Sequence, residues 1–302
     1  MRLSTLALAS LFFLTFVGLL GGQTPDKKTD TNHLKMALVN FKSVYSDTAD
    51  PAVNRANIAV NLKRHFFFID RLAAEKVDFV GFPEISLNGY RFSKNMTWLK
   101  IDGPEVKALQ KKAIENGIYI SVGIALEDAD GKRWNAQIVI DPQGRIVGLH
   151  RKIYLTKEKG FVEAGTDHKV FEVKGLKMGI AICADGSDRK NLQALVDTGA
   201  QIIYGPHANT TGGTIAGWYK FRASWAGPDG WIAQAKVYAA LHNHATHYSP
   251  EFGPAPTKDA SAGWASGAWF IGPDGKTLAQ MPTSTQKADS KEFVLIQSIP
   301  IR

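Results

Sequence analysis

The sequence predicts an α/β fold built on mixed β-sheets. Apolar runs rich in β-branched residues alternate along the chain with segments whose apolar residues recur at helical spacing. Several strand-like runs are joined by short turns such as "DPQG" at 141–144, as antiparallel neighbours require. The hydrophobic content of 44% supports a substantial core, and no fixed repeat or low-complexity linker follows residue 33. We therefore expect a single domain over 34–302.

The first half of this domain is predicted as strands separated by two long helices. In chain order we expect a strand at 35–41, a helix at 54–76, a strand at 77–84, a helix at 103–117, a strand at 118–127 and a turn-linked strand pair over 133–152. Pro104 near the start of the second helix and Gly117 after its end are typical signals for the beginning and the end of a helix.

The second half repeats the alternation with shorter elements. We expect a strand pair around Gly175 at 171–183, a helix at 188–200, a strand beginning at 201, a helical region at 214–236 interrupted by Gly227-Pro228, and strands within 237–243, 267–279 and 291–301.

The N-terminus has the layout of an export signal. Arg2 precedes an almost continuous apolar run from Leu6 to Leu20, and Gly21 and Gly22 follow. Because the run is near the lower length limit for a bilayer span, an uncleaved membrane anchor stays open beside the favoured cleaved signal over 1–23. A polar, disordered leader is expected at 24–33. The protein is thus predicted to be exported, either periplasmic or secreted, and possibly anchored by residues 6–20.

The positive charge does not indicate a nucleic-acid partner. The formal net charge is +8, but the lysines and arginines are scattered, with no basic arm. The glycine-containing "GPHANTTGGT" at 205–214 lacks the Gly-Lys-Ser/Thr ending of a phosphate loop. We expect neither nucleic-acid nor nucleotide binding.

Cys183 is the only cysteine of the chain. An exported protein with a single thiol can use it in an intermolecular bridge, as an inert buried residue or as a reactive group. The thiol follows the apolar run "MGIAI" and precedes the turn-like "ADGSD". A nucleophile often projects from such a strand-to-turn corner, although this stretch taken alone favours a small, buried core residue.

Other polar residues also stand where predicted strands end. Glu84, Lys152 and Asn243 close apolar runs, as Cys183 does. Since ligands of open α/β sheets bind at the carboxyl ends of strands, these residues are expected to meet at one edge. A buried Glu84 suits proton transfer and a half-buried Lys152 suits an oxyanion, while a salt-bridged glutamate and a snorkelling lysine remain the plain interpretations.

Taken together, "FPEISLNGY" (82–90), "HRKIYL" (150–155) and "GIAICAD" (179–185) resemble the nitrilase, or carbon–nitrogen hydrolase, superfamily. The resemblance covers nearly the whole domain and implies a four-layer α-β-β-α sandwich. It implies that Glu84 is the general base, Lys152 the oxyanion stabiliser and Cys183 the nucleophile. It also implies a second glutamate near the lysine, for which Glu158 is preferred over Glu163.

The segments that line the pocket in relatives depart from the family pattern. Ala184 replaces the aromatic residue that usually follows the cysteine, and no tryptophan directly follows Ala208-Asn209. We expect the substrate to contact Ala184, through its backbone N–H, and Tyr90, His207 and Asn209.

The function implied is hydrolysis of a non-peptide C–N bond in a small linear amide or carbamoyl compound through a Cys183 thioester. An acyltransferase that uses the same intermediate, a nitrilase and a non-enzymatic module remain alternatives. No metal or organic cofactor is required. A metal site at His242, His244 and His247 is the less favoured interpretation of "HNHATH", and a pocket-rim or polar-loop role is preferred. The resemblance further implies a homodimer or larger homo-oligomer.

Overall fold

Two six-stranded sheets form the centre of the fold in this computed structural model, which describes residues 32–211, 213–249, 252, 264–283 and 291–301. The first sheet has the order β12-β1-β2-β3-β4-β5, and the second has the order β11-β10-β9-β8-β7-β6. The strands of the first sheet are β1 (His33–Asn40), β2 (Phe79–Gly81), β3 (Tyr119–Glu127), β4 (Arg133–Ile140), β5 (Ile146–Arg151) and β12 (Phe293–Pro300). Those of the second are β6 (Val170–Val173), β7 (Leu176–Ile180), β8 (Ile202–Pro206), β9 (Tyr238–His242), β10 (Ala268–Ile271) and β11 (Thr277–Gln280).

Both sheets are mixed, as the turn-linked strand pairs predict. In each, three neighbouring strands are parallel, β1-β2-β3 in one and β7-β8-β9 in the other. Helices connect these parallel strands, because a parallel pair needs a crossover. The remaining neighbours are antiparallel, including β12, which pairs along the whole of β1 with Leu38 opposite Leu295.

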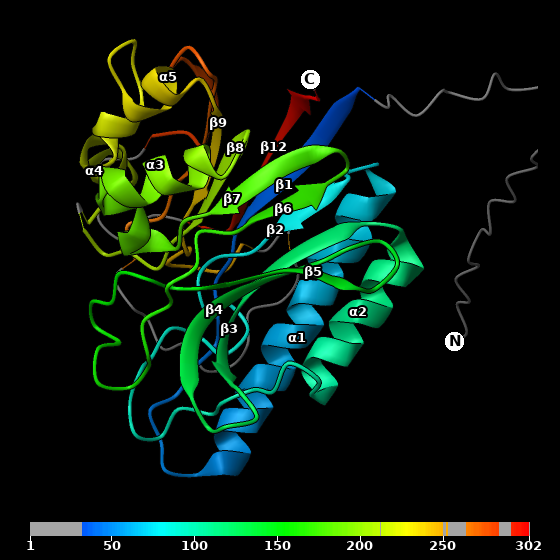
Figure 1. Cartoon of the computed structure of the whole chain (residues 1–302). Helices are drawn as coiled ribbons and strands as arrows, with labels where there is room; N and C mark the ends of the chain where they lie inside the picture. The colour runs from blue at the N-terminus through cyan, green and yellow to red at the C-terminus, as the bar shows by residue number, and fades with distance from the viewer. Residues whose placement is uncertain (1–31, 212, 250–251, 253–263, 284–290, 302) are drawn as a thin grey trace, which may run out of the picture. The chain divides into compact units, whose positions relative to one another are not determined.

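Helices cover the two outer faces of the paired sheets (Figure 1). The long α1 (Pro51–Ala74) and α2 (Pro104–Asn116) lie on the first sheet. The shorter elements lie on the second sheet: α3 (Arg189–Asp197), α4 (Ile215–Phe221), α5 (Trp231–Ala235) and the 3₁₀ turns η1 (Cys183–Ser187) and η2 (Ala223–Trp225). The α-β-β-α order of layers confirms the predicted sandwich.

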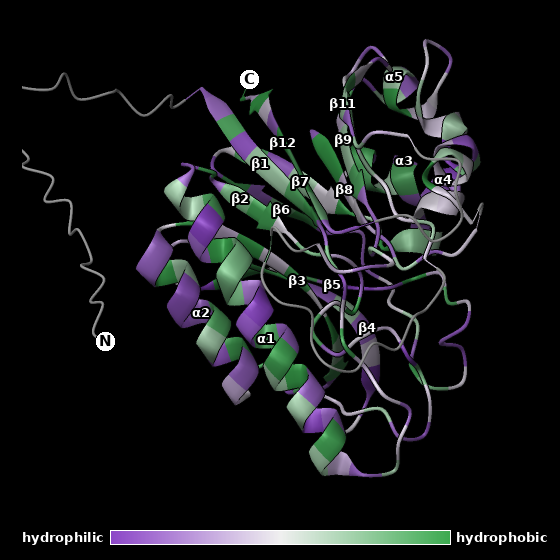
Figure 2. Ribbon diagram, turned by 180° about the vertical axis from the view of Figure 1, so that it is seen from behind, coloured by the Kyte–Doolittle hydropathy of each residue, from purple (hydrophilic) through white to green (hydrophobic). Residues whose placement is uncertain are grey.

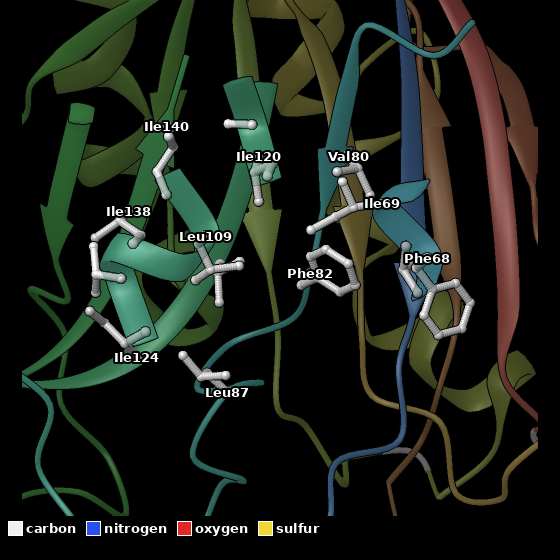
Figure 3. Packing of buried hydrophobic residues seen from close by; sticks show 14 of the residues in the cluster. Phe68, Ile69, Val80, Phe82, Leu87, Leu109, Ile120, Ile124, Ile138 and Ile140 are labelled. Atoms are coloured by element: carbon white, nitrogen blue, oxygen red, sulfur yellow. The ribbon is translucent and has the colours of Figure 1, made fainter. Parts of the chain in front are cut away.

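Side-chain alternation along β1 shows how the layers are held. Ala37 and Val39 face the cluster under α1 and α2, whereas Met36 and Leu38 face the second sheet. Figure 3 shows the first cluster, in which Phe68 of α1 packs with side chains of the sheet. In Figure 2 most strands are green, while α1 and α2 are banded green and purple, as half-buried helices require.

Local sequence explains the helix boundaries. Asp50 caps α1 by accepting a hydrogen bond from the Ala52 N–H, and Pro51 begins the helix, so α1 starts three residues earlier than predicted. Gly117 ends α2 in a left-handed conformation (φ 62°), as its position predicts.

Residues from Asn32 onward form one compact unit. Among the residues that the structure describes, no helix is long and apolar enough to cross a membrane. The predicted signal or anchor at 1–23 and most of the leader at 24–33 lie outside the described residues, so export remains a prediction. Oligomerisation likewise remains a prediction.

Candidate active site

Glu84 lies just beyond β2, at the edge where the chain leaves the first sheet. The strand ends at Gly81, earlier than predicted, because Pro83 has no N–H for the ladder and Ile85 turns back with a φ of 52°. The Glu84 side chain is fully buried. Its Oε1 accepts hydrogen bonds from Lys152 Nζ (2.8 Å) and Asn135 Nδ2 (2.7 Å), and its Oε2 accepts one from the Ala208 N–H (2.8 Å). The carboxylate is therefore held in one orientation by three donors.

Gly123 of β3 allows the Glu84 turn to lie directly on the sheet. A Cβ at this position would approach the backbone of the turn to 2.2 Å at Ile85 N and 2.5 Å at Pro83 O. Backbone atoms in a packed turn cannot move aside as the end of a flexible side chain can. The glycine thus sets the position of the carboxylate.

Gly123→Ala is expected to displace the Glu84 turn. The overpacking is expected to lower the free energy of unfolding by about 1–3 kcal/mol and to reduce turnover. Thermal unfolding and kcat measured on the same preparation check both effects. A variant with unchanged unfolding and unchanged turnover would contradict this role of Gly123.

Lys152 is buried between two carboxylates. Its Nζ forms ion pairs with Glu84 Oε1 and with Glu158 Oε1, and all three side chains are fully inaccessible. The structure thus places Glu158, rather than Glu163, beside the lysine. Glu163 is exposed and lines a separate hollow.

Hydrogen bonds link the second carboxylate to the walls of the site. Glu158 Oε2 accepts hydrogen bonds from Tyr90 Oη and Thr156 Oγ1, both 3.1 Å long. Asn135 Nδ2 lies 3.4 Å from Glu158 Oε1 and also donates to Glu84. Asn135 therefore spans the two carboxylates from the side of β4.

Burial and the shared cation act oppositely on these groups. Burial raises the pKa of Glu84 even though Lys152 favours its charged form. Burial also opposes the charged form of Glu158, but Lys152 outweighs that effect and lowers the pKa of this carboxyl. Burial disfavours the Lys152 ammonium, yet the facing acidic groups, Glu84 foremost, hold its pKa well above the usual value. Glu84 is therefore the carboxyl suited to accept and hold a proton, and Glu158 is the one that stays ionised.

Cys183 stands at the corner between β7 and η1. Its backbone is left-handed, with a φ of 47°, which is uncommon for a residue with a side chain. The corner matches the predicted strand-to-turn position and directly follows the apolar run that ends with Ile182.

Asp185 ties the Cys183 corner to the strand end that carries Lys152. Its Oδ1 accepts the N–H groups of Ile153 and Tyr154, at 3.0 Å and 2.7 Å. Its Oδ2 binds His150 Nε2 and accepts the Ile182 N–H. This carboxylate therefore fixes the thiol corner of the second sheet against the end of β5 in the first sheet.

The thiol is buried but lies in the same cluster as Glu84 and Lys152. Asn209 Nδ2 is 3.9 Å from Cys183 Sγ, and the adjacent Ala208 N–H binds Glu84. Burial and, to a smaller extent, the Glu84 carboxylate raise the pKa of Cys183 to about 11, against the opposing effect of the positive charges of Lys152 and Arg222. At neutral pH the thiol is thus protonated, and its use as a nucleophile requires a base.

A cavity of about 210 Å³ opens beside Cys183. Tyr90, Ala184 and Asn209, three of the four residues expected to contact a substrate, line this cavity. His207 does not line it: its ring is fully buried, binds the Gly205 carbonyl through Nδ1 and packs edge-on against Trp218. A larger hollow of about 580 Å³ near α1 and β12 contains none of the residues of the cluster.

His242 and His244 act as supports rather than as a rim. His242 binds Tyr204 Oη and the Val39 carbonyl, and His244 Nε2 donates to the Glu84 backbone carbonyl. Both rings are fully buried, and burial lowers the pKa of each, to about 3 and about 4 respectively. No group of three or more metal-ligating side chains occurs in the described part of the chain.

Three residues of the site, Asn135, Arg222 and Asp185, were not assigned a role from the sequence. Asn135 stands in "WNAQIVI", but nothing in a strand sequence shows which facing strand its amide reaches. Arg222, which lines the cavity and binds the Cys183 carbonyl, lies in a region predicted only as interrupted helix. Asp185 was visible in "CAD", but its partners became evident only in the folded chain.

The sequence of this chain is similar to those of known amidases. The chain is 33% identical to the N-carbamoylputrescine amidase of Arabidopsis thaliana over 35% of its length and 37% of that protein. It is 27% identical to the omega-amidase NIT2-A of Xenopus laevis over 80% of its length and 83% of that protein. The match to the plant enzyme thus spans little more than a third of that protein.

Solved structures agree with the architecture. Nit3 of Saccharomyces cerevisiae, a member of branch 10 of the nitrilase superfamily, aligns over 89% of this chain and 90% of its own, with a TM-score of 0.67 and 19% identity. The family model for carbon-nitrogen hydrolases matches residues 36–300, which is nearly the whole described unit. The chain therefore belongs to the carbon-nitrogen hydrolase family, within the nitrilase superfamily.

Proposed function

We propose that this protein is a thiol amidohydrolase that cleaves a non-peptide C–N bond in a small linear amide or carbamoyl compound. The observation that carries the proposal is the buried Glu84–Lys152–Glu158 cluster beside the chain's only thiol. A purely structural site gains little from burying three ionisable side chains together, because desolvation offsets much of their attraction. Family membership and the amidases among the relatives support the same reaction class.

Attack on the substrate requires a proton to leave Cys183. Glu84 accepts the S–H proton, and the sulfur forms a bond to the carbonyl carbon as the C=O bond becomes a C–O⁻ single bond. Lys152 has three N–H donors, two of which its carboxylate partners occupy, so the third is available to the oxyanion. The Ala184 backbone N–H, at the cavity wall, is the second proposed donor.

Collapse of the tetrahedral intermediate breaks the C–N bond. Glu84 returns its proton to the departing nitrogen, which leaves as ammonia or an amine, and Cys183 remains acylated as a thioester. Water then gives a proton to Glu84 and attacks the thioester carbon. The C–S bond then breaks, Glu84 gives its proton to the departing sulfur, and the carboxylic acid, or carbamic acid from a carbamoyl compound, leaves the restored Cys183 thiol. Glu158 stays ionised and keeps Lys152 protonated and in place.

The cavity volume of about 210 Å³ suits a small linear substrate. The test is to incubate the protein with a library of amides and carbamoyl compounds, measure ammonia release, and locate acyl adducts by intact-mass and peptide analysis. We expect release of ammonia and an adduct on Cys183 alone.

Two results would count against the proposal. An acyl adduct on any residue other than Cys183 would overturn the assigned nucleophile. Acyl transfer to a supplied amine, with little free acid formed, would replace hydrolysis by an acyltransferase reaction.

A further inference from the structure

Arg222 is a buried cation at the Cys183 cavity that the proposed reaction does not use. The residue is only 2% exposed and lies directly after α4. Its Nη2 donates to the Cys183 carbonyl (2.8 Å), and its Nη1 donates to Ser187 Oγ (3.1 Å). Both partners are neutral, so these bonds hold the guanidinium without neutralising it.

No carboxylate in the described part of the chain forms an ion pair with Arg222. The two acidic groups of the cluster, Glu84 and Glu158, are both paired with Lys152 instead. A buried charge without a counterion destabilises the folded state, because no ion pair offsets the free energy lost when the charge leaves water. Burial lowers the pKa of Arg222, yet a guanidinium stays protonated in proteins, so the charge persists.

The lining of the cavity complements a negative charge. Lys157, which is exposed and makes no ion pair among the described residues, borders the same cavity as Arg222. Hydroxyl and amide groups supply the remaining polar lining, and no acidic side chain belongs to it. These hydrogen-bonding side chains are Tyr90, Thr156, Ser187, Asn209, Thr210 and Thr211.

We propose that the substrate is an amide that carries a carboxylate, and that Arg222 binds this carboxylate while Cys183 attacks the amide. The proposal rests on the proposed function. A guanidinium has five N–H donors in a planar fork that matches a carboxylate, so its remaining donors can orient the substrate. Because Arg222 binds the backbone of the nucleophile itself, the carboxylate and the scissile amide are separated by a short chain.

The first experiment compares amides of matched length and different charge with the unaltered protein. Succinamate and glutaramate are anionic, butyramide and valeramide are neutral, and 3-aminopropanamide and 4-aminobutanamide are cationic. We expect kcat/KM of at least one anionic amide to exceed that of its neutral counterpart by about 10–100-fold, the worth of one charge-assisted hydrogen bond. Cationic amides should be the poorest substrates. A preference for neutral or cationic amides overturns the proposal.

Variants separate binding of the carboxylate from support of Cys183. In Arg222→Gln the ratio of kcat/KM for anionic over neutral amides should fall to near one, and Arg222→Lys should retain much of it. Lys220→Gln is a matched control, because Lys220 is an exposed cation two residues away that does not line the cavity. An equal loss for all charge classes in Arg222→Gln would show that Arg222 supports the nucleophile and does not select the substrate.

Binding to a Cys183→Ala variant tests the inference independently of catalysis. Calorimetric titration should show tighter binding of succinamate or glutaramate than of butyramide or valeramide, and Arg222→Gln in the same background should remove the difference. Equal binding of anionic and neutral amides overturns the inference even if amides are hydrolysed. Preferential binding of the anion without ammonia release by the unaltered protein would instead uphold the anion site and overturn the hydrolase assignment.

Discussion

Cys183→Ala is expected to lower kcat for every amide substrate by about 10⁴–10⁶-fold, because the reaction loses the atom that bonds to the carbonyl carbon. The thiol lies in the cluster of Glu84 and Lys152, and no second cysteine can replace it. Ammonia release under saturating substrate measures the effect.

The same variant should fold normally. Alanine tolerates the left-handed backbone about as well as cysteine, and the Asp185 hydrogen bonds that hold the corner do not involve Sγ. An unchanged melting temperature therefore serves as the control. Turnover close to that of the unaltered protein would falsify the thiol mechanism and would point to direct attack by water.

Lys152→Met is expected to produce the largest loss of stability among single changes at the site. The substitution leaves Glu84 and Glu158 buried without their common cation, and breaking a buried ion pair costs about 3–5 kcal/mol. Turnover should be lost as well, since the proposed oxyanion donor is gone. Chemical denaturation at neutral pH measures the change in the free energy of unfolding.

The stability loss should depend on pH in a defined direction. Without the ammonium, burial raises the folded-state pKa of both carboxyls above their unfolded values. Such groups favour folding below the unfolded pKa, and that contribution disappears as the pH rises through the folded pKa. The gap between the unaltered protein and Lys152→Met is therefore expected to be smaller at pH 5 than at pH 8. A gap that widens on acidification would contradict this account.

Lys174→Met provides a matched control for the effect of burial. Lys174 also pairs with a carboxylate, Asp78, but both side chains of that pair are 27% exposed. Partly exposed pairs contribute about 0–1 kcal/mol, so this variant should unfold close to the unaltered protein. A comparable loss in both variants would show that removal of the lysine side chain, rather than the buried charge, sets the cost.

The order of elements was predictable because its signals are local. Pro104 and Gly117 mark the ends of α2, and the turn at 141–144 joins β4 to β5, as their sequences indicate. The strand containing Glu84 was predicted too long, because the chain leaves the ladder at Gly81 through Pro83 and the left-handed Ile85. The close approach of that turn to Gly123, which helps to set where it lies, is a contact between segments distant in sequence.

The candidate site was only partly predictable for the same reason. Glu84, Lys152 and Cys183 stand at strand ends, and strand ends can be recognised from apolar runs that finish in polar residues. The roles of Asn135, Asp185 and Arg222 depend on partners 35 to 51 residues away in the sequence, and no local pattern predicts such contacts. His207 shows the converse, since its segment reaches the cavity but its ring points into the core beside Trp218.

The sequence by itself determined the α/β class, the mixed sheets, the lone thiol and, through family resemblance, the Glu84, Lys152 and Cys183 set. Only the tertiary structure decided that Glu158 rather than Glu163 shares the lysine, and that Arg222, which has no ion-pair partner among the described residues, borders the nucleophile. The physical reason is that residues close together in the sequence determine the helical and strand periodicities, so the sequence alone predicts these elements. The electrostatic environment of a buried site depends instead on charged and polar groups from distant parts of the sequence. These groups come together only when the two sheets pack face to face.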